Sequence, residues 1–516
     1  MSKMSNSLGW FLGIAIAGVS VSGHCVHAQI TPDGTLPNNS IVNINGNIFN
    51  ISGGTQAGSN LFHSFNEFSV RTGSEVHFNN AVDIQNIISR VTGSSVSNID
   101  GLIKILQGNA NLFLLNSNGI VFGPNAQLDI RGSFVASTAN SIKFADGFEF
   151  SATAPQTKPL LTVSVPIGLQ YGRNPGSVLN QSRASDISYE TVGLQVQPGK
   201  TLALVGGNVS LDGGVLQAPG GRVELGGVAG TGTVGLNVDG NNLRLSFPSG
   251  IAQADVSLTD RAQVEGSDIQ VKGRRITLTN GSEILATFGK SGNIQLQAKD
   301  LLLLRRNSVI SGVSGKAGSN ASDGNINIDT KFLVAVHSEN SDIIATGFGQ
   351  AADSNINVKT LGIFGTEFRQ QQTQESDIVA SGGFGYSGTV IINSSLGLVE
   401  LPTLLADASN IIDTSCAAFA NGNSSQFTIT GRGGLPPNPY EPLSTDVVWS
   451  DTRTSAITTQ QQARKTPAAK PPSKAETVEI VPASGWVFNG KGQVTLISHA
   501  SNANSLRSTP TSCPKQ

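Results

Sequence analysis

Short apolar runs separated by turn residues follow one another along most of this chain. The clearest stretch runs from Ala110 to Phe144, where Leu112–Leu115 and Ile120–Phe122 flank an Asn-Ser-Asn-Gly segment at 116–119. Short polar side chains followed by a glycine are what a tight turn between strands requires. The runs are about three to six residues long, which is short for strands that cross a whole sandwich or doubly wound sheet. Short strands in this regular succession predict a solenoid.

Two short units recur in the second half of the chain. Copies of the first begin with S-E-I-L-A at Ser282, S-D-I-I-A at Ser341 and S-D-I-V-A at Ser376. Copies of the second begin at Gly292, Gly324, Ser354 and Gly388, at spacings of 32, 30 and 34 residues. Such a unit cannot bury its apolar face alone, so it must stack on its neighbours. We therefore expect an all-β fold from about Ile41 to Ile429, a right-handed parallel β-helix (β-solenoid) with little helix.

Two sets of side chains predict how this solenoid is stabilised. One asparagine in each copy of the second unit falls in register, which predicts a ladder of amides along the axis: Asn293, Asn325 and Asn355. Near the amino terminus, Phe62, Phe65 and Phe68 recur at helix-like spacing after two short alternating strands at Ile41–Ile51. An aromatic ligand platform is one interpretation, but terminal coils must cover apolar surface. We therefore expect an amino-terminal capping region.

The first 28 residues have the pattern of a cleaved signal peptide. Lys3 supplies a positive charge, Leu8–Val21 an apolar segment, and Val26-His27-Ala28 a small-residue cleavage pattern. The alternative is a membrane anchor, but the apolar segment is shorter than the roughly twenty residues that cross a bilayer. His24 and the missing upstream leucine argue against a lipoprotein at Cys25.

The turn motif itself points to a family. Asn116, Ser117, Asn118, Gly119 and Ile120 stand where the family signature reads Asn-Pro-Asn-Gly-Ile, with serine in place of proline. The chain around the motif, from about Asn43 to Phe150, resembles the haemagglutination-activity, or two-partner secretion, domain of filamentous-haemagglutinin-like exoproteins. We expect a cyanobacterial-type member. A second signature of some members, Asn-Pro-Asn-Leu, does not occur in this sequence.

The resemblance implies a non-enzymatic exoprotein with a defined export partner. An outer-membrane transporter with periplasmic receptor domains would recognise the amino-terminal domain, and the chain would fold as a β-helix outside the cell. Adhesion to an unknown host or cell-surface receptor, or to a polysaccharide, is the expected role. We divide the chain into residues 1–28 (signal peptide), 29–165 (two-partner secretion domain), 166–430 (β-helix passenger repeats) and 431–516 (Pro-rich linker and terminal β-hairpin). The hairpin is expected to turn near Asn489-Gly490.

Within this resemblance, the turn motif is the expected site of transporter recognition. We expect Asn116 and Asn118 to fix the turn through hydrogen bonds from their side chains to the backbone. In doing so they would shape the surface that the transporter engages. The alternative is that both residues close an ordinary β-turn, because asparagine is common at turns throughout this chain.

Composition bears on the binding partners that the chain can have, and the cysteine content bears on whether it forms a disulfide after export. Charged residues make up 13% of the chain, which has 60 glycines and a net charge of −2. These values fit a turn-dense β protein and give no electrostatic reason to expect nucleic acid as a partner. Loss of the signal peptide would remove Cys25 and leave Cys416 and Cys513. In an exported chain these predict one disulfide, with two free thiols as the alternative.

Candidate catalytic and cofactor motifs are weak. Gly230–Gly235 spells G-x-G-x-x-G, but strand-like alternation follows it where a dinucleotide site needs a helix. The histidines are scattered without metal-ligand spacing. Asp342 and Asp377 recur at equivalent repeat positions, which fits a coil corner better than an active site or a calcium site. We therefore expect no enzyme activity, no cofactor and no metal.

Three rival functions remain open at this point. A parallel β-helix also hosts polysaccharide lyases and glycosidases, for which Asp342 and Asp377 would be the candidate carboxylates. An autotransporter would need a carboxy-terminal barrel of alternating strands, which the Pro-rich tail lacks. A carrier of a contact-dependent growth inhibition toxin would need a catalytic domain in a tail that reads as linker and hairpin.

Overall fold

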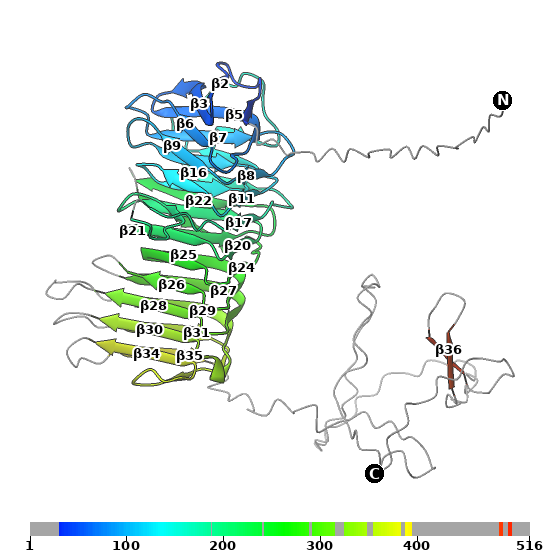
Figure 1. The fold of residues 1–516 in the computed structure, drawn as a ribbon, viewed down its shortest axis with the longest axis vertical. Coiled ribbons are helices and arrows are strands. Elements are labelled where there is room, and N and C mark those ends of the chain that lie inside the picture. The colour runs from blue at the N-terminus through cyan, green and yellow to red at the C-terminus, as the bar shows by residue number, and fades with distance from the viewer. Residues whose placement is uncertain are drawn as a thin grey trace, which may run out of the picture. The chain divides into compact units, whose positions relative to one another are not determined.

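The computed structural model describes residues 30–186, 188–239, 242–287, 292–314, 325–347, 354–382, 388–394, 485–488 and 494–497. The chain divides into two units, one up to Thr403 and one from Leu404. In the first unit, short strands stack coil upon coil in one direction (Figure 1). Each coil has three faces, because the chain forms a strand, turns a corner and forms the next strand.

Strands that pair in parallel from coil to coil make each face. Face one comprises β5 (Asn60–Phe68), β7 (Asn86–Val91), β10 (Asn111–Leu115), β13 (Phe134–Ser137), β19 (Thr201–Gly206), parts of β21 (Val215–Gly227), β25 (Gln263–Leu278), β27 (Asn293–Leu304) and β29 (Asn325–Val334), then β31 (Asn355–Thr360) and β35 (Thr389–Ser394).

Face two comprises β8 (Ser97–Ile99), β11 (Ile120–Phe122), β17 (Val178–Asn180), β20 (Val209–Asp212), β24 (Val256–Thr259), the ends of β25, β27 and β29, and β32 (Gly362–Phe364). Face three comprises β3 (Ile48–Gly53), β6 (Glu75–Phe78), β9 (Leu102–Ile105), β12 (Gln127–Asp129), β18 (Leu194–Gln195), the starts of β21 and β25, β26 (Glu283–Ala286), β28 (Val309–Ser314), β30 (Asp342–Gly347) and β34 (Asp377–Gly382).

The predicted repeats pair directly in the structure. Asn325 of β29 lies opposite Asn355 of β31, which in turn lies opposite Thr389 of β35. The Asn355 side-chain amide donates to Asn325 at 3.2 Å, and Asn293 donates to Asp268 at 3.2 Å. The amide-to-amide bond of the predicted ladder is thus observed between Asn355 and Asn325. The Asn293 amide donates instead to the Asp268 carboxylate. The fold class predicted from the sequence, an all-β parallel β-helix, is confirmed for the described residues. Residues 395–429 of the predicted solenoid lie outside them.

Antiparallel strands close the amino-terminal end of the stack. β1 (Ile30–Pro32) and β4 (Thr55–Ala57) pair with β5, and β2 (Ser40–Asn45) pairs with β3. Phe65 and Phe68 are buried inside the first coil with ring centroids 5.3 Å apart, next to an irregularity in the β1–β5 register. Phe62 points elsewhere and packs against Phe144 and Phe150 in a second apolar cluster. Two of the three phenylalanines therefore lie in the coil core next to the cap.

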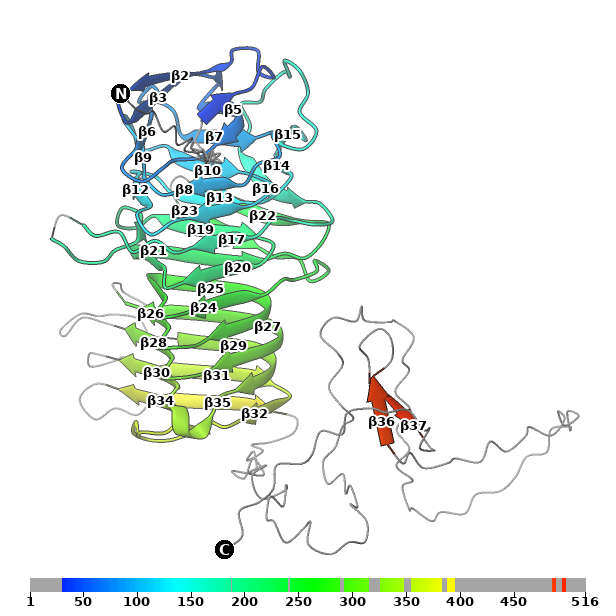
Figure 2. The same ribbon diagram turned by 45° about the vertical axis from the view of Figure 1, so that its right-hand side comes forward.

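Two excursions from the coils form an antiparallel sheet over face one. It consists of β14 (Ser141–Phe144), β15 (Glu149–Ser151), β16 (Pro166–Tyr171), β22 (Gly232–Asp239) and β23 (Asn242–Ser246). Figure 2 shows β14, β15 and β16 beside the upper coils. Buried side chains of this sheet pack on the outward side of face one, for example on Ala203 and Val205 of β19.

Two smaller elements lie among the later coils. β33 (Glu367–Phe368) pairs with β34, and a three-residue 3-10 helix, His337–Glu339, is the one helical element among the described residues. No helix in the described part of the chain is long and apolar enough to cross a membrane. In the second unit, β36 (Gly485–Phe488) and β37 (Val494–Ile497) pair antiparallel within the segment where a hairpin is predicted. Its turn at Asn489-Gly490 lies outside the described residues.

Candidate functional site

The Asn116–Ile120 motif forms the corner between faces one and two. β10 ends at Leu115, and β11 begins at Ile120. The Gly119 N–H donates to the Asn116 carbonyl at 3.2 Å, which closes the turn. Gly119 has a φ of 136°, in the region that favours glycine, so the glycine of the motif is required by the backbone. Ile120 is buried in the coil core.

The Asn116 side chain is fully buried and joins the turn to the preceding coil. Its Nδ2 atom donates to the Ser95 carbonyl and to Ser97 Oγ, each at 2.9 Å. Its Oδ1 atom accepts from the Asn118 N–H at 3.0 Å and from Asn118 Nδ2 at 2.9 Å. The bonds to the Ser95 carbonyl and from the Asn118 N–H are of the predicted side-chain-to-backbone kind, and the other two join side chains. Together they leave Asn116 no polar surface for a partner.

Asn118 differs, because it is exposed. Its Nδ2 atom also donates to the Gly93 carbonyl of the preceding coil at 2.8 Å. The Ser117 carbonyl accepts from the Gly176 N–H at 3.0 Å, so the next coil holds the turn from its other side. No bond of the Ser117 N–H is seen among the described residues, which fits a position that takes proline in the family signature. The motif thus presents Asn118 and part of Ser117 on a rigid corner.

A buried polar network that sequence reasoning missed ties the cap to the coils. Arg90 of β7 is 1% exposed and donates to Ser64 Oγ at 2.8 Å, Thr35 Oγ1 at 2.7 Å and the Ser151 carbonyl at 2.6 Å. Its guanidinium lies 4.0 Å from the centre of the Phe150 ring. Burial lowers the pKa of Arg90 to about 10, while the Asp33 charge opposes that change.

Asp33 completes this network from the segment after β1. It accepts from Ser64 Oγ at 2.7 Å, Thr92 Oγ1 at 2.6 Å and Thr35 Oγ1 at 2.7 Å. Burial raises the pKa of Asp33, but these hydrogen bonds outweigh it and hold the pKa below its usual value. The network fixes the cap, β5, β7 and β15 relative to one another.

A second missed feature is a ladder of buried asparagines along face one. Asn86 donates to Asn60 at 2.9 Å, and Asn111 donates to Asn86 at 3.1 Å. The Ser133 N–H continues the ladder by donating to Asn111 Oδ1 at 2.9 Å. The sequence contains a pattern that could have predicted this ladder, because each of these asparagines precedes two apolar residues at the start of a strand.

The rival catalytic residues lie at coil corners. Asp342 and Asp377 are buried, and the Asp377 N–H donates to Asp342 Oδ1 at 2.9 Å. Arg369 and Thr373 bind the Asp377 carboxylate, so neither acid lines an open cleft. Gly230–Gly235 leads into β22, a strand. Within the described ranges, no three His, Cys, Asp or Glu side chains group as a metal site would require. Cys416 and Cys513 lie outside the described residues.

Comparison with known proteins identifies the region that contains the turn. Residues 28–275 match the family model for the TPS (two-partner secretion) secretion domain. This chain carries a TPS secretion domain. It is therefore a two-partner secretion exoprotein, which an outer-membrane transporter recognises through this domain and exports to the cell surface or the extracellular space.

Two solved structures are similar to the chain that carries this TPS domain. The HMW1 secretion domain from Haemophilus influenzae is 15% identical, with 72% of this chain and 100% of that chain covered and a TM-score of 0.38. The filamentous hemagglutinin secretion domain is 14% identical, with coverage of 71% and 99% and a TM-score of 0.33. The search of curated proteins found no match.

The TPS domain match spans more structure than the sequence resemblance did. It covers the cap, the coils up to Arg275 near the end of β25, and the antiparallel sheet over face one. The Asn116–Ile120 turn, the Arg90 network and the asparagine ladder all lie within it. The chain continues beyond the TPS domain as further coils from β26 to β35.

Proposed function

We propose that this exoprotein is an adhesin whose coils beyond the TPS domain present repeated polar surface to a host or cell-surface receptor. The observation that carries the proposal is the continuous stack from β26 to β35, which extends the solenoid past the secretion domain. A rigid array of this kind can combine many weak contacts, so it does not need a deep pocket.

Export would use two recognition steps. Residues 1–28 would act as a signal peptide for the general export pathway. The periplasmic receptor domains of the transporter would then read the corner at Asn116–Ile120. Two properties of Asn118 support this recognition role. Its side chain is exposed, and hydrogen bonds to Asn116 and Gly93 hold that side chain in one position. A preorganised side chain loses little conformational freedom on binding.

The division of the chain and its tail belong to the same proposal. We assign residues 29–165 to the minimal recognition region, 166–430 to the passenger coils and 431–516 to the linker and hairpin. After export, Cys416 and Cys513 would pair and close a loop across the linker, which contributes about 4 kcal/mol in the chain-entropy model. Mass spectrometry of the exported protein should show the linked peptides, and two free thiols would contradict the pairing.

No catalytic step is part of the proposed function. The burial and hydrogen bonding of Asp342 and Asp377 support a structural role for the residues that suggested a lyase or glycosidase.

Deletion of the coils beyond the TPS domain tests the adhesive role. Beads would be coated with equal amounts of the exported full chain or of a chain that lacks β26–β35. Only the full chain should attach to cells. Equal attachment by both proteins would contradict the proposal, and secretion of both would show that export had not been disturbed.

A further inference from the structure

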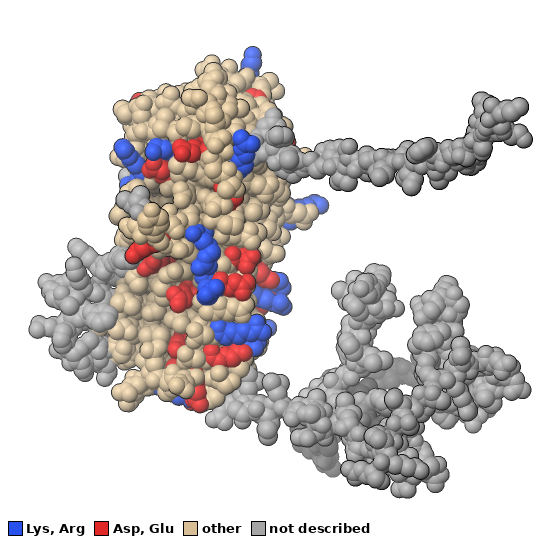
Figure 3. All heavy atoms as spheres, in the orientation of Figure 1, with Lys and Arg blue, Asp and Glu red and all other residues tan. Residues whose placement is uncertain are grey.

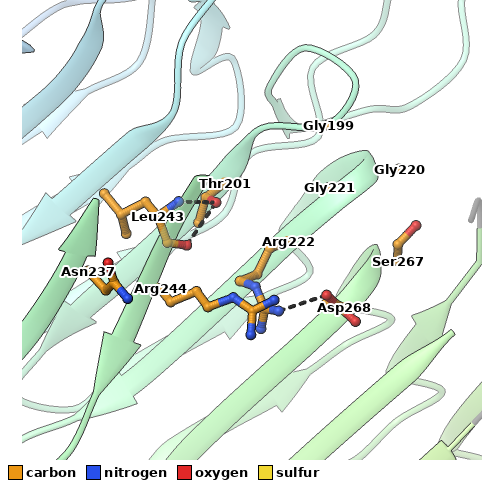
Figure 4. A pocket seen from close by; sticks show the side chains of 10 residues that line it. All are labelled: Gly199, Thr201, Gly220, Gly221, Arg222, Asn237, Leu243, Arg244, Ser267 and Asp268. Atoms are coloured by element: carbon orange, nitrogen blue, oxygen red, sulfur yellow. Dashed lines mark hydrogen bonds and ion pairs between the residues drawn. The ribbon is translucent and has the colours of Figure 1, made fainter. Parts of the chain in front are cut away.

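Three hollows lie on the outer surface of face one, two of them beside the edge strand β23 and the third beside the segment that follows it. The first, of about 360 Å³, is bordered by Arg222, Arg244 and Asp268 (Figure 4). The second, of about 350 Å³, shares these three residues and reaches Gln295 and Asn327. The third, of about 960 Å³, is lined by the next outward-facing residues of the same strands, among them Gln297 and Asp329. The hollows therefore form one continuous polar strip.

Side-chain amides make up the middle of this strip. Gln270, Gln295, Asn327 and Asn357 stand opposite one another on successive strands β25, β27, β29 and β31. The Asn357 amide donates to Asn327 at 3.1 Å. Each amide offers both donors and an acceptor. A column of such groups suits a ligand with many hydroxyl groups and does not suit an apolar one.

Cations line the same strip in excess. Among the described residues that line the hollows there are two acids, Asp268 and Asp329, and six cations: Arg222, Arg244, Lys272, Lys299, Lys331 and Lys359. The chain as a whole has a net charge of −2, and Figure 3 shows its charged side chains in small clusters of both signs on a mostly uncharged surface. The strip is therefore locally positive.

Two of these cations are already neutralised by the acids. Arg222 Nη2 lies 2.7 Å from Asp268, and Lys359 Nζ lies 3.8 Å from Asp329. The Arg244 side chain is exposed, makes no hydrogen bond or ion pair among the described residues, and reaches from β23 toward the Arg222–Asp268 pair. Its charge also opposes the rise in the pKa of the buried Glu224 carboxyl. An unpaired guanidinium beside a hollow is well suited to hold a carboxylate.

We propose that this strip binds an acidic polysaccharide that lies along the axis of the coils. Its carboxylates would face Arg244 and the lysines, and its hydroxyls would bond to the amide column. The lysines come from successive strands of face one, which are spaced about 4.8 Å apart, so they can follow a linear polyanion. Duplex DNA fits less well, because its deoxyribose backbone carries no hydroxyl groups for the amide column. The inference rests on the proposed adhesive role.

Binding of alginate, a polyuronate, by the exported full chain tests this inference. The test variant is Arg244→Gln/Lys299→Gln/Lys331→Gln, which removes three exposed cations of the strip that no acid among the described residues neutralises. The charge-matched control is Arg261→Gln/Arg275→Gln/Arg306→Gln, three exposed arginines that line none of the three hollows. Circular dichroism and the secreted amount establish that each variant folds. The test variant should bind alginate about 10- to 100-fold more weakly, since it loses three exposed charge contacts at once.

The outcomes separate the ligand classes. Wild-type binding that weakens with salt, is retained by the control and exceeds binding to neutral dextran would support the proposal. Equal loss in both variants, equal binding of dextran, or equally tight binding of duplex DNA would overturn it. If beads coated with the wild-type protein bind alginate but fail to attach to cells, the strip assignment stands and the adhesive role fails.

Discussion

Replacement of the two motif asparagines one at a time should separate stability from recognition. Asn116 is buried and makes four side-chain hydrogen bonds, two donated and two accepted. A net contribution of about 1 kcal/mol per bond, with some recovery by water at the exposed Ser95 carbonyl, gives a loss of about 3 kcal/mol for Asn116→Ala. Asn118 is exposed and makes one bond to another coil, so Asn118→Ala should cost about 1 kcal/mol or less.

The measurement pairs stability with export. Urea unfolding of the purified chain, followed by circular dichroism, gives the free-energy differences, and immunoblots of medium and periplasm give the exported fraction. Asn118→Ala should fold normally yet accumulate in the periplasm. Asn98→Ala, at an exposed asparagine in the neighbouring strand β8, is the control and should be exported normally. Normal secretion of Asn118→Ala would refute the recognition role, and an unchanged stability of Asn116→Ala would refute the hydrogen-bond reasoning.

Three further substitutions have defined outcomes. Arg90→Leu removes three hydrogen bonds that the buried guanidinium donates and leaves their acceptors unpaired, so it should destabilise the chain by about 3–5 kcal/mol in urea unfolding, whereas a loss below about 1 kcal/mol would contradict the network. Glu224 of β21 is fully buried, and burial raises its pKa to about 7, against the opposing effect of Arg222. A raised carboxyl pKa means that the folded state binds the extra proton, so stability should fall as the pH rises from about 4.5 to 7, by about 3 kcal/mol at most. Urea titrations at several pH values in this range should show that Glu224→Gln removes this decrease in the free energy of unfolding. An unchanged dependence on pH in the variant would contradict the raised pKa of Glu224. Ser117→Pro restores the family signature and should fold and be secreted as the wild type, because the lost N–H makes no hydrogen bond among the described residues; failure to fold would show that the turn cannot accept proline.

The coils could be predicted because inward-facing residues must recur wherever strands stack. The copies at Gly324, Ser354 and Gly388 were visible for this reason, and their strands pair as neighbours. The S-V-I-S-G-V-S segment at Ser308 was overlooked, although β28 lies between β26 and β30. It has valine where the other copies have an acid, so only its apolar pattern marks it as a coil.

Buried polar groups were harder to predict than the coils. A lone arginine such as Arg90 has the composition of a surface residue, and only the folded cap brings Thr35, Ser64 and Asp33 to it. Glu224 is buried because the antiparallel sheet that contains β23 covers part of face one, and the coil pattern carries no signal of such an excursion. The turn motif can be predicted from the sequence because short polar residues and glycine mark a corner locally.

The most direct test of the account is export of the full chain with and without its outer-membrane transporter in the same host. We predict that the chain reaches the medium or the cell surface only when the transporter is present, and that it stays in the periplasm otherwise. Equal amounts outside the cell under both conditions would contradict the two-partner export mechanism.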